Sequence, residues 1–430
     1  MTYYKRTADA LLQDLLDAFG AVLIEGPKWC GKTTTASQLA NSILRMQDPS
    51  MREEYLATAK TKPSILLKGD TPRLIDEWQD APMLWDAVRT TVDDRQIPGQ
   101  FILTGSNAVD KSQIHHSGAG RIARLRMLPM SLWESQESTG EVSLKELFNN
   151  PDYDIDGKMS KMTVEDLIFA ASRGGWPASL LARTPKAQLL VAKNYVQTIC
   201  SDDVSGIDGK KRDAKLTSMI LRAYARNVST LVKKKSLLDD VTSSGEVSCH
   251  VDTFDDYVSA LEKLFVIQNI SAWCPAIRSK TAIRSSVKRC FCDPSIPIAL
   301  LGLSPESLSM QLRTFGFIFE QMCIRDLKAY TIDLNSHVSY YHDRYDLEAD
   351  IVLHLEDGRY ALIECKLGSS EIDEGAKHLL ELKRLIQEHN KTEKQVPIRE
   401  PDLLIVMTGG TMAYSRPDGV KVIPLACLKD

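Results

Sequence analysis

The segment Gly26-Pro27-Lys28-Trp29-Cys30-Gly31-Lys32-Thr33 constrains the fold of this chain more than any other feature, because it matches the pattern G-x-x-x-x-G-K-[ST]. It follows an apolar, strand-like run, Ala21 to Glu25, and precedes a predicted helix, Thr34 to Leu44. This order places backbone N–H groups and a helix N-terminus around a phosphate. The sequence therefore predicts a nucleotide-binding phosphate loop in a parallel α/β sheet.

The phosphate loop predicts binding of ATP with Mg²⁺. Lys32 would reach the β- and γ-phosphates, and the Thr33 hydroxyl would ligate Mg²⁺. The residues expected to contact the nucleotide are Gly26, Pro27, Lys28, Trp29, Cys30, Gly31, Lys32, Thr33 and Thr34.

Two further apolar runs end in polar residues suited to phosphate chemistry. The run from Arg73 ends in Asp76 and Glu77, where Asp76 would hold Mg²⁺ through water and Glu77 would act as general base on the attacking water. The run Phe101 to Gly105 is followed by Ser106 and Asn107. Asn107 could sense the γ-phosphate and orient the water, the alternative being an ordinary turn at the end of a strand.

An arginine before a fourth strand-like run could act on a neighbouring subunit. Arg121 precedes Ile122 to Leu128, and it is our candidate for an arginine finger acting in trans. Arg124 and Arg126 compete for this role, and a solvated strand face is the alternative. A finger in trans requires a homo-oligomer, either a dimer or a ring.

The composition excludes several classes of protein. The chain has 430 residues, which suggests about three domains, and 43% apolar with 26% charged residues is typical of soluble globular proteins. Its longest apolar stretches, such as Leu403 to Met407, have the length of buried strands, so we expect no membrane span. The nine cysteines show no zinc-site spacing and indicate reduced thiols in a cytoplasmic protein.

The net charge of −4 conceals one strongly basic segment. Residues 210–235 hold nine basic side chains and one acid, and helical patterns followed by two strand-like runs, Val266 to Trp273 and Lys288 to Cys292, suggest a winged helix. Such a domain would bind double-stranded DNA chiefly through phosphates. Solvated helix faces, or docking onto acidic parts of the chain, are the alternatives. The candidate DNA-binding residues are Lys210, Lys211, Arg212, Lys215, Lys233, Lys234, Lys235, Arg278, Lys280 and Arg284.

Motifs along nearly the whole chain resemble prokaryotic AAA+-type P-loop ATPases whose C-terminal half is a domain of unknown function. Besides the phosphate loop, the segments that carry this resemblance are Leu74 to Glu77, Phe101 to Asn107, Arg126 to Ser131, Arg173 to Pro177, Asp293 to Ile296, Phe315 to Glu320 and Glu348 to Leu353. The resemblance implies a helical lid in which Pro177 contacts the adenine. It also implies an oligomer, of which a hexameric ring is one form.

The last part of the chain carries acids in a second pattern. Asp350, then Glu364-Cys365-Lys366, with Glu320 on a preceding helix, is similar to the restriction-endonuclease-like arrangement. Strand alternation puts Glu364 and Lys366 on one face, so Glu320, Asp350 and Glu364 could hold a metal while Lys366 stabilises the attacking hydroxide. The fold is the firmer expectation, because Glu-x-Lys pairs also occur on half-buried strands of domains that only bind.

These observations predict an α/β protein with four parts. They are a P-loop AAA+-type ATPase domain (1–150), a helical lid (151–205), a winged helix (206–295) and a restriction-endonuclease-like α/β domain (296–430). The predicted function is ATP hydrolysis in an oligomer, coupled to binding, remodelling or translocating double-stranded DNA. The alternatives are a nucleotide-controlled switch that docks a protein partner and an ATP-gated, metal-dependent nuclease.

Overall fold

The computed structural model describes residues 3–107, 114, 116–243, 245, 247–273, 286–343, 345–391 and 397–430. The chain divides into two compact units, Met1–Pro129 with Glu262–Phe265, and Met130–Leu261 with Val266–Asp430.

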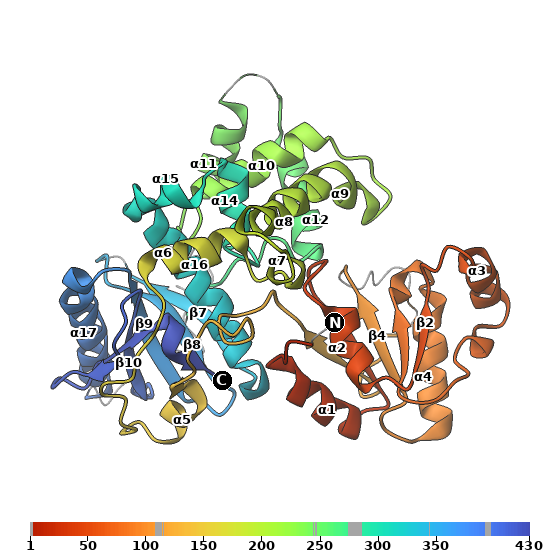
Figure 1. The fold of residues 1–430 in the computed structure, drawn as a ribbon, viewed down its shortest axis with the longest axis horizontal. Coiled ribbons are helices and arrows are strands. Elements are labelled where there is room, and N and C mark those ends of the chain that lie inside the picture. The colour runs from red at the N-terminus through yellow and green to blue at the C-terminus, as the bar shows by residue number, and fades with distance from the viewer. Residues whose placement is uncertain are drawn as a thin grey trace. The chain divides into compact units, whose positions relative to one another are not determined.

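The first unit is built on a five-stranded parallel sheet with the strand order β2-β3-β4-β1-β5 (Figure 1). The strands are β1 (Ala21–Glu25), β2 (Ser42–Arg45), β3 (Arg73–Asp76), β4 (Phe101–Gly105) and β5 (Ile122–Arg126). The helices are α1 (Ala8–Ala18), α2 (Lys32–Leu39), α3 (Arg52–Thr61) and α4 (Met83–Arg95), with short 3₁₀ turns at Pro63–Ile65 and Trp78–Asp80. The sheet confirms the predicted parallel α/β architecture.

The two faces of this sheet are covered by different helices because strand side chains alternate between them. One face buries Leu23, Ile75 and Leu103 against apolar side chains of α4, including Trp85 and Val88. On the other face lie α1 and α2, which bury Leu12, Leu16 and Ala36 (Figure 1). All phosphate-loop chemistry then falls at the carboxyl edge of the sheet, where β1, β3 and β4 end side by side.

One predicted element in this unit is wrong. The helix expected from Thr34 to Leu44 ends at Leu39, and Ser42–Arg45 forms the edge strand β2, paired in parallel with β3. Ser42 to Arg45 is too short for its periodicity to distinguish strand from helix. The backbone of β3 offers it a row of hydrogen-bonding partners, and that pairing decides the conformation.

The second unit joins a helical region to a mixed sheet. The helical region contains α6 (Val164–Arg173), α7 (Pro177–Leu180), α8 (Pro185–Thr198) with a π-helical turn at Ile199–Asp203, α9 (Val204–Gly206), α10 (Ala214–Arg226), α11 (Lys234–Thr242), α12 (Val251–Lys263), α14 (Ser295–Leu301) and α15 (Pro305–Ser309). The two strand-like runs after α12 form isolated bridges, which are antiparallel between Ile267 and Phe291 and between Ile270 and Lys288, and parallel between Ala272 and Tyr340.

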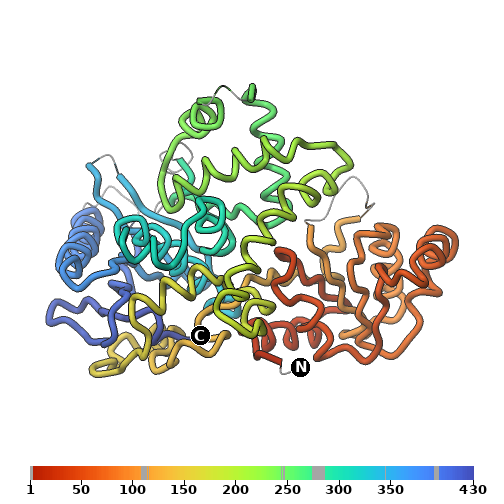
Figure 2. The backbone as a smooth tube through the Cα atoms, turned by 45° about the horizontal axis from the view of Figure 1, so that its top comes forward, coloured from red at the N-terminus to blue at the C-terminus, as the bar shows by residue number. Residues whose placement is uncertain are grey.

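The sheet of the second unit has six strands in the order β11-β12-β10-β9-β8-β7. They are β7 (His337–His342), β8 (Glu348–His354), β9 (Tyr360–Lys366), β10 (Leu403–Thr408), β11 (Tyr414–Ser415) and β12 (Lys421–Pro424). The helix α17 (Ile372–Asn390) packs on one face, and α16 (Leu312–Tyr330) contacts β7, β8 and β9 from the other (Figures 1 and 2). Strand β10 agrees with the buried strand that the apolar run Leu403 to Met407 predicts.

The chain just after the first sheet is bound to the C-terminal end. Val142–Ser143 (β6), which precedes α5 (Leu144–Asn149), pairs in parallel with Leu428–Lys429 (β13). The Ser138 hydroxyl also donates to the Leu428 carbonyl over 2.5 Å. Segments far apart in the sequence therefore fold together in the second unit.

Candidate nucleotide site

The phosphate loop runs from the end of β1 to the start of α2 in a conformation that requires glycine. Gly26 and Gly31 have φ values of +154° and +103°. A Cβ atom on Gly26 would lie 2.2 Å from the carbonyl oxygen of Met127. Only a glycine fits so close to a neighbouring backbone. The loop thus has the conformation that its sequence pattern predicts.

Lys32 lies buried beneath this loop. Its ammonium group donates to the carbonyl oxygens of Gly26 and Pro27 over 3.0 and 2.8 Å. These two contacts hold the cation inside the curve of the loop, where a phosphate would bind. Trp29 is 45% exposed with a φ of +64°, whereas Cys30 is fully buried, and Thr34 is exposed on the first turn of α2.

Asp76 connects the loop to the centre of the sheet. Its Oδ1 accepts hydrogen bonds from the hydroxyls of Thr33 and Thr104, each over 2.6 Å. These oxygen atoms are the kind of ligands that Mg²⁺ prefers. Thr104 was not among the sequence candidates, although its place at the end of β4 could have indicated it.

Glu77 follows Asp76 in a left-handed conformation with a φ of +55°. Its carboxylate accepts from Ser106 Oγ over 3.0 Å and from the Gln79 side-chain amide. A non-glycine residue in this region is uncommon, and such positions are found at functional sites. The carboxylate is therefore positioned on two sides, by Gln79 and by the residue after β4.

Three polar atoms around Glu77 are buried without a hydrogen-bond partner among the described residues. They are Asn107 Oδ1, Gln79 Oε1 and Trp78 Nε1. Buried polar atoms in folded proteins are nearly always hydrogen-bonded to protein, water or ligand. Together with the oxygen atoms of Thr33 and Asp76, these three atoms fit a site that binds a polar ligand.

The candidate arginine fingers lie on β5, the edge strand of the sheet. Arg121 precedes the strand at its amino end, and its Nε donates to Asp93 Oδ1 over 2.7 Å, which lowers the pKa of Asp93. Arg124 and Arg126 each lie 3.5 Å from Glu25, the residue before the phosphate loop. Within one chain, therefore, Arg126 lies beside the loop at the carboxyl end of β5, whereas Arg121 lies at the amino end of the same strand.

Arg6 was not among the residues predicted from the sequence, but its side chain holds the phosphate loop in place. This buried guanidinium donates to the carbonyl oxygens of Cys30 and Leu128, each over 2.8 Å. Arg6 thereby joins the phosphate loop to the chain leaving β5. Nothing in the local sequence distinguishes Arg6 from a surface arginine.

The predicted lid residue Pro177 begins α7 in the second unit. The glycines before it are explained by packing there, since a Cβ on Gly175 would lie 2.2 Å from the Met130 carbonyl oxygen. Trp176 is fully buried, and its indole donates to Ser295 Oγ over 3.0 Å. Contact of Pro177 with adenine stays a prediction.

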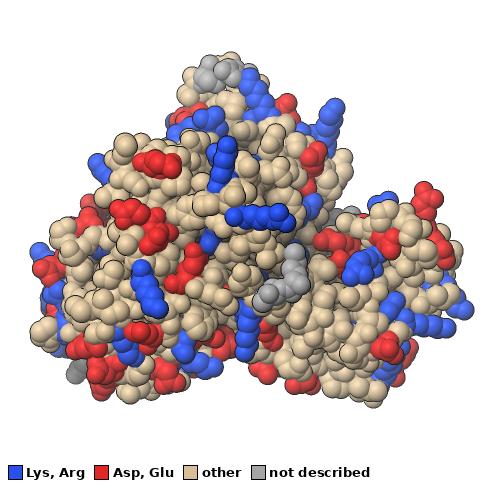
Figure 3. All heavy atoms as spheres, in the orientation of Figure 1, with Lys and Arg blue, Asp and Glu red and all other residues tan. Residues whose placement is uncertain are grey.

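Several of the predicted DNA-binding residues pair with acids of the same unit. Lys210 contacts Asp256 at 2.7 Å, buried Arg212 contacts Asp208 and Asp256, and Lys234 contacts Asp255 at 2.9 Å. Lys211, Lys215, Lys233 and Lys235 are exposed. Arg278, Lys280 and Arg284 lie outside the described residues. On the face seen in Figure 3, basic and acidic side chains are interspersed.

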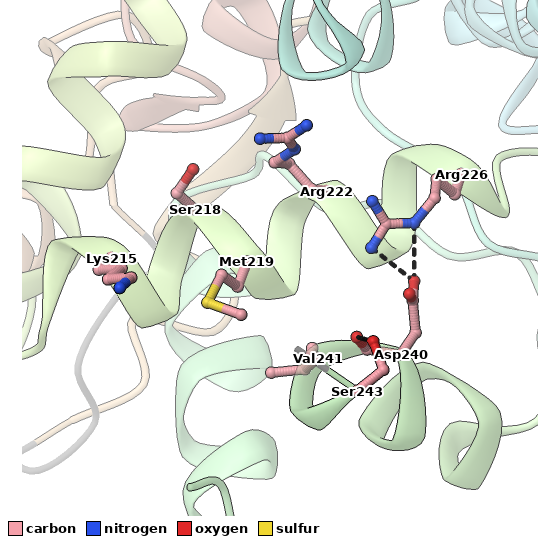
Figure 4. Close-up of a pocket in the computed structure, with 8 residues that line it drawn as sticks. All are labelled: Lys215, Ser218, Met219, Arg222, Arg226, Asp240, Val241 and Ser243. Carbon is pink, nitrogen blue, oxygen red and sulfur yellow. Dashed lines mark hydrogen bonds and ion pairs between the residues drawn. The ribbon is translucent and has the colours of Figure 1, made fainter. Parts of the chain in front are cut away.

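A cavity of about 540 Å³ lies between α10 and α11. Figure 4 shows that one wall of the cavity is α10 and the other is α11 with the residue that follows it. The lining residues are Lys215, Ser218, Met219, Arg222 and Arg226 on α10, and Asp240, Val241 and Ser243 on the other wall. Arg226 forms an ion pair with Asp240 at 2.8 Å. The spacing of the α10 residues is that of one helical face, which is therefore basic.

The C-terminal acids are distributed between two lysines. Glu320 forms an ion pair with buried Lys288, whose ammonium also lies 3.7 Å from Asp350 Oδ1. Although burial alone lowers it, the charges of Glu320 and Asp350 raise the pKa of Lys288. Glu364 is fully buried 3.0 Å from Lys366, and burial raises its pKa to about 9. Cys365 lies between them in sequence, and its N–H donates to Asp350 Oδ2 over 2.9 Å.

Three family models match this chain. An AAA domain matches residues 18–136, which include the phosphate loop, Asp76, Glu77 and the five strands. The chain carries an AAA-type P-loop ATPase domain. After this AAA domain come two domains of unknown function, DUF8612 at residues 164–307 and DUF4143 at residues 315–428. The recognition of an AAA+-type ATPase with an uncharacterised C-terminal domain is confirmed.

The similar proteins add little detail about the task of the AAA domain. Uncharacterized proteins Mb2031c of Mycobacterium bovis and Rv2008c of Mycobacterium tuberculosis are each 24% identical over 370 residues, or 84% of this chain and 73% of theirs. A solved Walker-type ATPase of Pyrococcus abyssi is 12% identical, covering 70% of this chain and 96% of its own, with a TM-score of 0.41. None of the helices in the described part of the chain is long and apolar enough to cross a membrane.

Proposed function

We propose that the AAA domain hydrolyses ATP to ADP and phosphate. The observation that carries this proposal is the arrangement at the end of β3, where Asp76 is bound to Thr33 of the phosphate loop and Glu77 is oriented by Ser106. The proposed magnesium ligand, Asp76, and the proposed base, Glu77, are adjacent residues beside the phosphate loop.

Each residue of the site has a separate role in the proposed hydrolysis. Lys32 and the loop N–H groups bind the β- and γ-phosphates, while Glu77 takes a proton from the attacking water. Asn107, whose buried Oδ1 lacks a partner among the described residues, can accept a hydrogen bond from that water. Mg²⁺ bound with the nucleotide neutralises phosphate charge, and Thr33 and Asp76 are the residues that would hold it.

The test is ATP turnover and ATP binding in Glu77→Gln. Glutamine keeps the shape but cannot take the proton, so turnover should fall by about 10²- to 10⁴-fold while ATP binding persists. Asp80→Asn is the matched control, since Asp80 pairs at 3.8 Å with Arg52 and should leave turnover unchanged. Undiminished turnover in Glu77→Gln would show that another group is the base.

We propose in addition that the active form is a homo-oligomer in which Arg121 serves a neighbouring nucleotide. In support, β5 is an edge strand and the Arg121 side chain is 48% exposed. Mixing Arg121→Ala chains with Glu77→Gln chains should restore part of the activity that each lacks alone, because some interfaces then combine an intact base with an intact arginine. Arg124→Ala and Arg126→Ala, mixed in the same way, identify the finger if Arg121 is not the one. Light scattering then separates a dimer from a ring.

The DNA-coupled function receives support from the cavity between α10 and α11. Lys215 and Arg222 line it from the basic face of α10, and such a face suits the phosphates of double-stranded DNA. Linear duplex DNA should then stimulate ATP turnover at low salt, and Arg222→Ala should weaken this effect more than Lys186→Ala, a change at an exposed lysine of α8. Turnover indifferent to DNA would favour the nucleotide-controlled switch with a protein partner.

A further inference from the structure

The C-terminal acids allow a direct test of whether this chain fits the metal of a nuclease. The strand pairing does bring two of them together. β8 and β9 pair with Ile351 opposite Ile363, so Asp350 and Glu364 are the next residues along the two antiparallel strands. The hydrogen bond from Cys365 N–H to Asp350 Oδ2 confirms their proximity.

Lys288 holds the position between Asp350 and the third acid, Glu320, where a cation would bind. Lys288 Nζ donates to Glu320 and to the Asp350 main-chain oxygen, the latter over 2.9 Å, and lies 3.7 Å from Asp350 Oδ1. Only 6% of the lysine side chain is exposed, as against 10% for Glu320 and 13% for Asp350. One ammonium thus faces two nearly buried carboxylates.

The backbone around Lys288 fixes its position. Its N–H donates to the Ile270 carbonyl over 2.9 Å, and its carbonyl accepts from the Ile270 N–H over 3.2 Å. The ring of Tyr340 lies 5.6 Å from the ammonium and adds a cation–π contact. Lys288 is therefore part of a paired, packed segment rather than a mobile surface side chain.

Because Lys288 already pairs with Glu320 and Asp350, too few ligands remain for a metal. Glu364 keeps two oxygens without hydrogen bonds, but it faces the ammonium of Lys366 at 3.0 Å and His378 at 3.7 Å. Among the residues that the structure describes, no group of three or more histidine, cysteine, aspartate or glutamate side chains could hold a metal ion. The residues present do not fit the metal that the sequence pattern implied.

We propose that Lys288 is the resident cation of this carboxylate cluster, in place of a divalent metal. The lysine neutralises Glu320 and Asp350 and ties the segment after α12 to the C-terminal sheet. The nuclease-like acids then serve a structural ion cluster, and the chain does not cleave nucleic acid through them. Removing the ammonium, however, should leave the Glu320 carboxylate, the Asp350 carboxylate and the Asp350 main-chain oxygen around one position, where a divalent cation can replace the lysine.

The experiment uses electron paramagnetic resonance to measure how much Mn²⁺ the full chain binds in the absence of nucleotide. Asp76→Asn serves as the background for every variant, so that the phosphate-loop site does not contribute. With Lys288 present, adding Asp350→Asn should not change the amount of bound Mn²⁺. Lys288→Met should gain one Mn²⁺ site that Lys288→Met/Asp350→Asn loses. Lys366→Met, the matched change at the other lysine, should gain none.

Three results would overturn the proposal. One is Mn²⁺ bound with Lys288 intact and lost in Asp350→Asn, another is no gain of Mn²⁺ binding in Lys288→Met, and the third is DNA cleavage that disappears in Asp350→Asn.

A stability comparison covers the case in which Lys288→Met does not fold, because a buried carboxylate without its counter-charge is strongly destabilising. Lys288→Met/Glu320→Gln/Asp350→Asn removes all three charges and should melt close to the wild-type temperature. If this triple variant were as unstable as Lys288→Met, the lysine would be needed for its packing and the charge-neutralising role would be wrong.

Discussion

The Thr33 hydroxyl donates to Asp76 Oδ1 over 2.6 Å, and this contact links the phosphate loop to the centre of the first sheet. The two residues are far apart in the sequence, yet parallel strands end at one edge and bring them together. A ligand that breaks the hydrogen bond between Thr33 and Asp76 therefore changes a contact at the end of β3, next to Glu77. The phosphate loop is thus linked through one hydrogen bond to the strand end that carries Glu77, the proposed base.

The loop lysine should dominate nucleotide affinity. Lys32→Met removes the ammonium that the loop carbonyls of Gly26 and Pro27 hold in place, so ATP affinity should fall by about 3 kcal/mol, or roughly 100-fold. Titration with a fluorescent ATP analogue measures this loss. Lys28→Met, on the same loop, is the control and should bind ATP much more tightly than Lys32→Met; equal losses would mean that the loop binds by general charge alone.

Arg6 should affect both stability and nucleotide binding. Arg6→Met leaves the carbonyls of Cys30 and Leu128 without their charged donor, at a cost of about 3 kcal/mol in the free energy of unfolding. Because Cys30 lies inside the phosphate loop, ATP should also bind more weakly. Chemical denaturation and ATP titration check the two effects, and Lys5→Met, at the exposed neighbouring position, should change neither. Normal ATP affinity in a destabilised Arg6→Met would limit Arg6 to a role in folding.

A second buried arginine should be needed for folding of the second unit. Arg325 lies 3.1 Å from Asp293 and 2.6 Å from Asp326, and all three side chains are almost fully buried. Arg325→Met leaves two buried carboxylates without their cation, so unfolding should become about 3–5 kcal/mol easier. Denaturant unfolding followed by circular dichroism measures this. Arg313→Met, at an exposed site near the start of the same helix, should be neutral, and a comparable loss there would contradict the argument.

The helical region should lose stability in acid through Asp208. Hydrogen bonds from Arg212 lower the pKa of Asp208 to about 2, from an unfolded value near 3.8. A lowered pKa means that the ionised acid stabilises the folded state above about pH 4, and that this contribution disappears as the pH falls toward 2. Asp208→Asn should therefore lower the melting temperature at pH 7 and have a smaller effect at pH 2.5. A difference that does not change with pH would assign the effect to packing.

The sequence by itself determined the parts of this protein whose physics is local. The spacing of Gly26, Gly31 and Lys32 between an apolar run and a helix predicts a phosphate loop, because the glycines permit the required backbone and the following helix supplies its N-terminus. The hydrophobic pattern is also local, and it predicts Asp76 and Glu77 at the end of an apolar run and a buried strand at Leu403 to Met407.

Only the tertiary structure decided where the charges find their partners. Arg6 and Lys288 look like ordinary basic residues in the sequence, yet one holds the phosphate loop and the other fills a carboxylate cluster. Lys210 and Arg212 were predicted to face DNA, but Asp256 contacts both. Ser42–Arg45 became a strand because β3 lies beside it. Such pairings depend on residues distant in the chain, since burial and neighbouring charge exist only once the elements have packed.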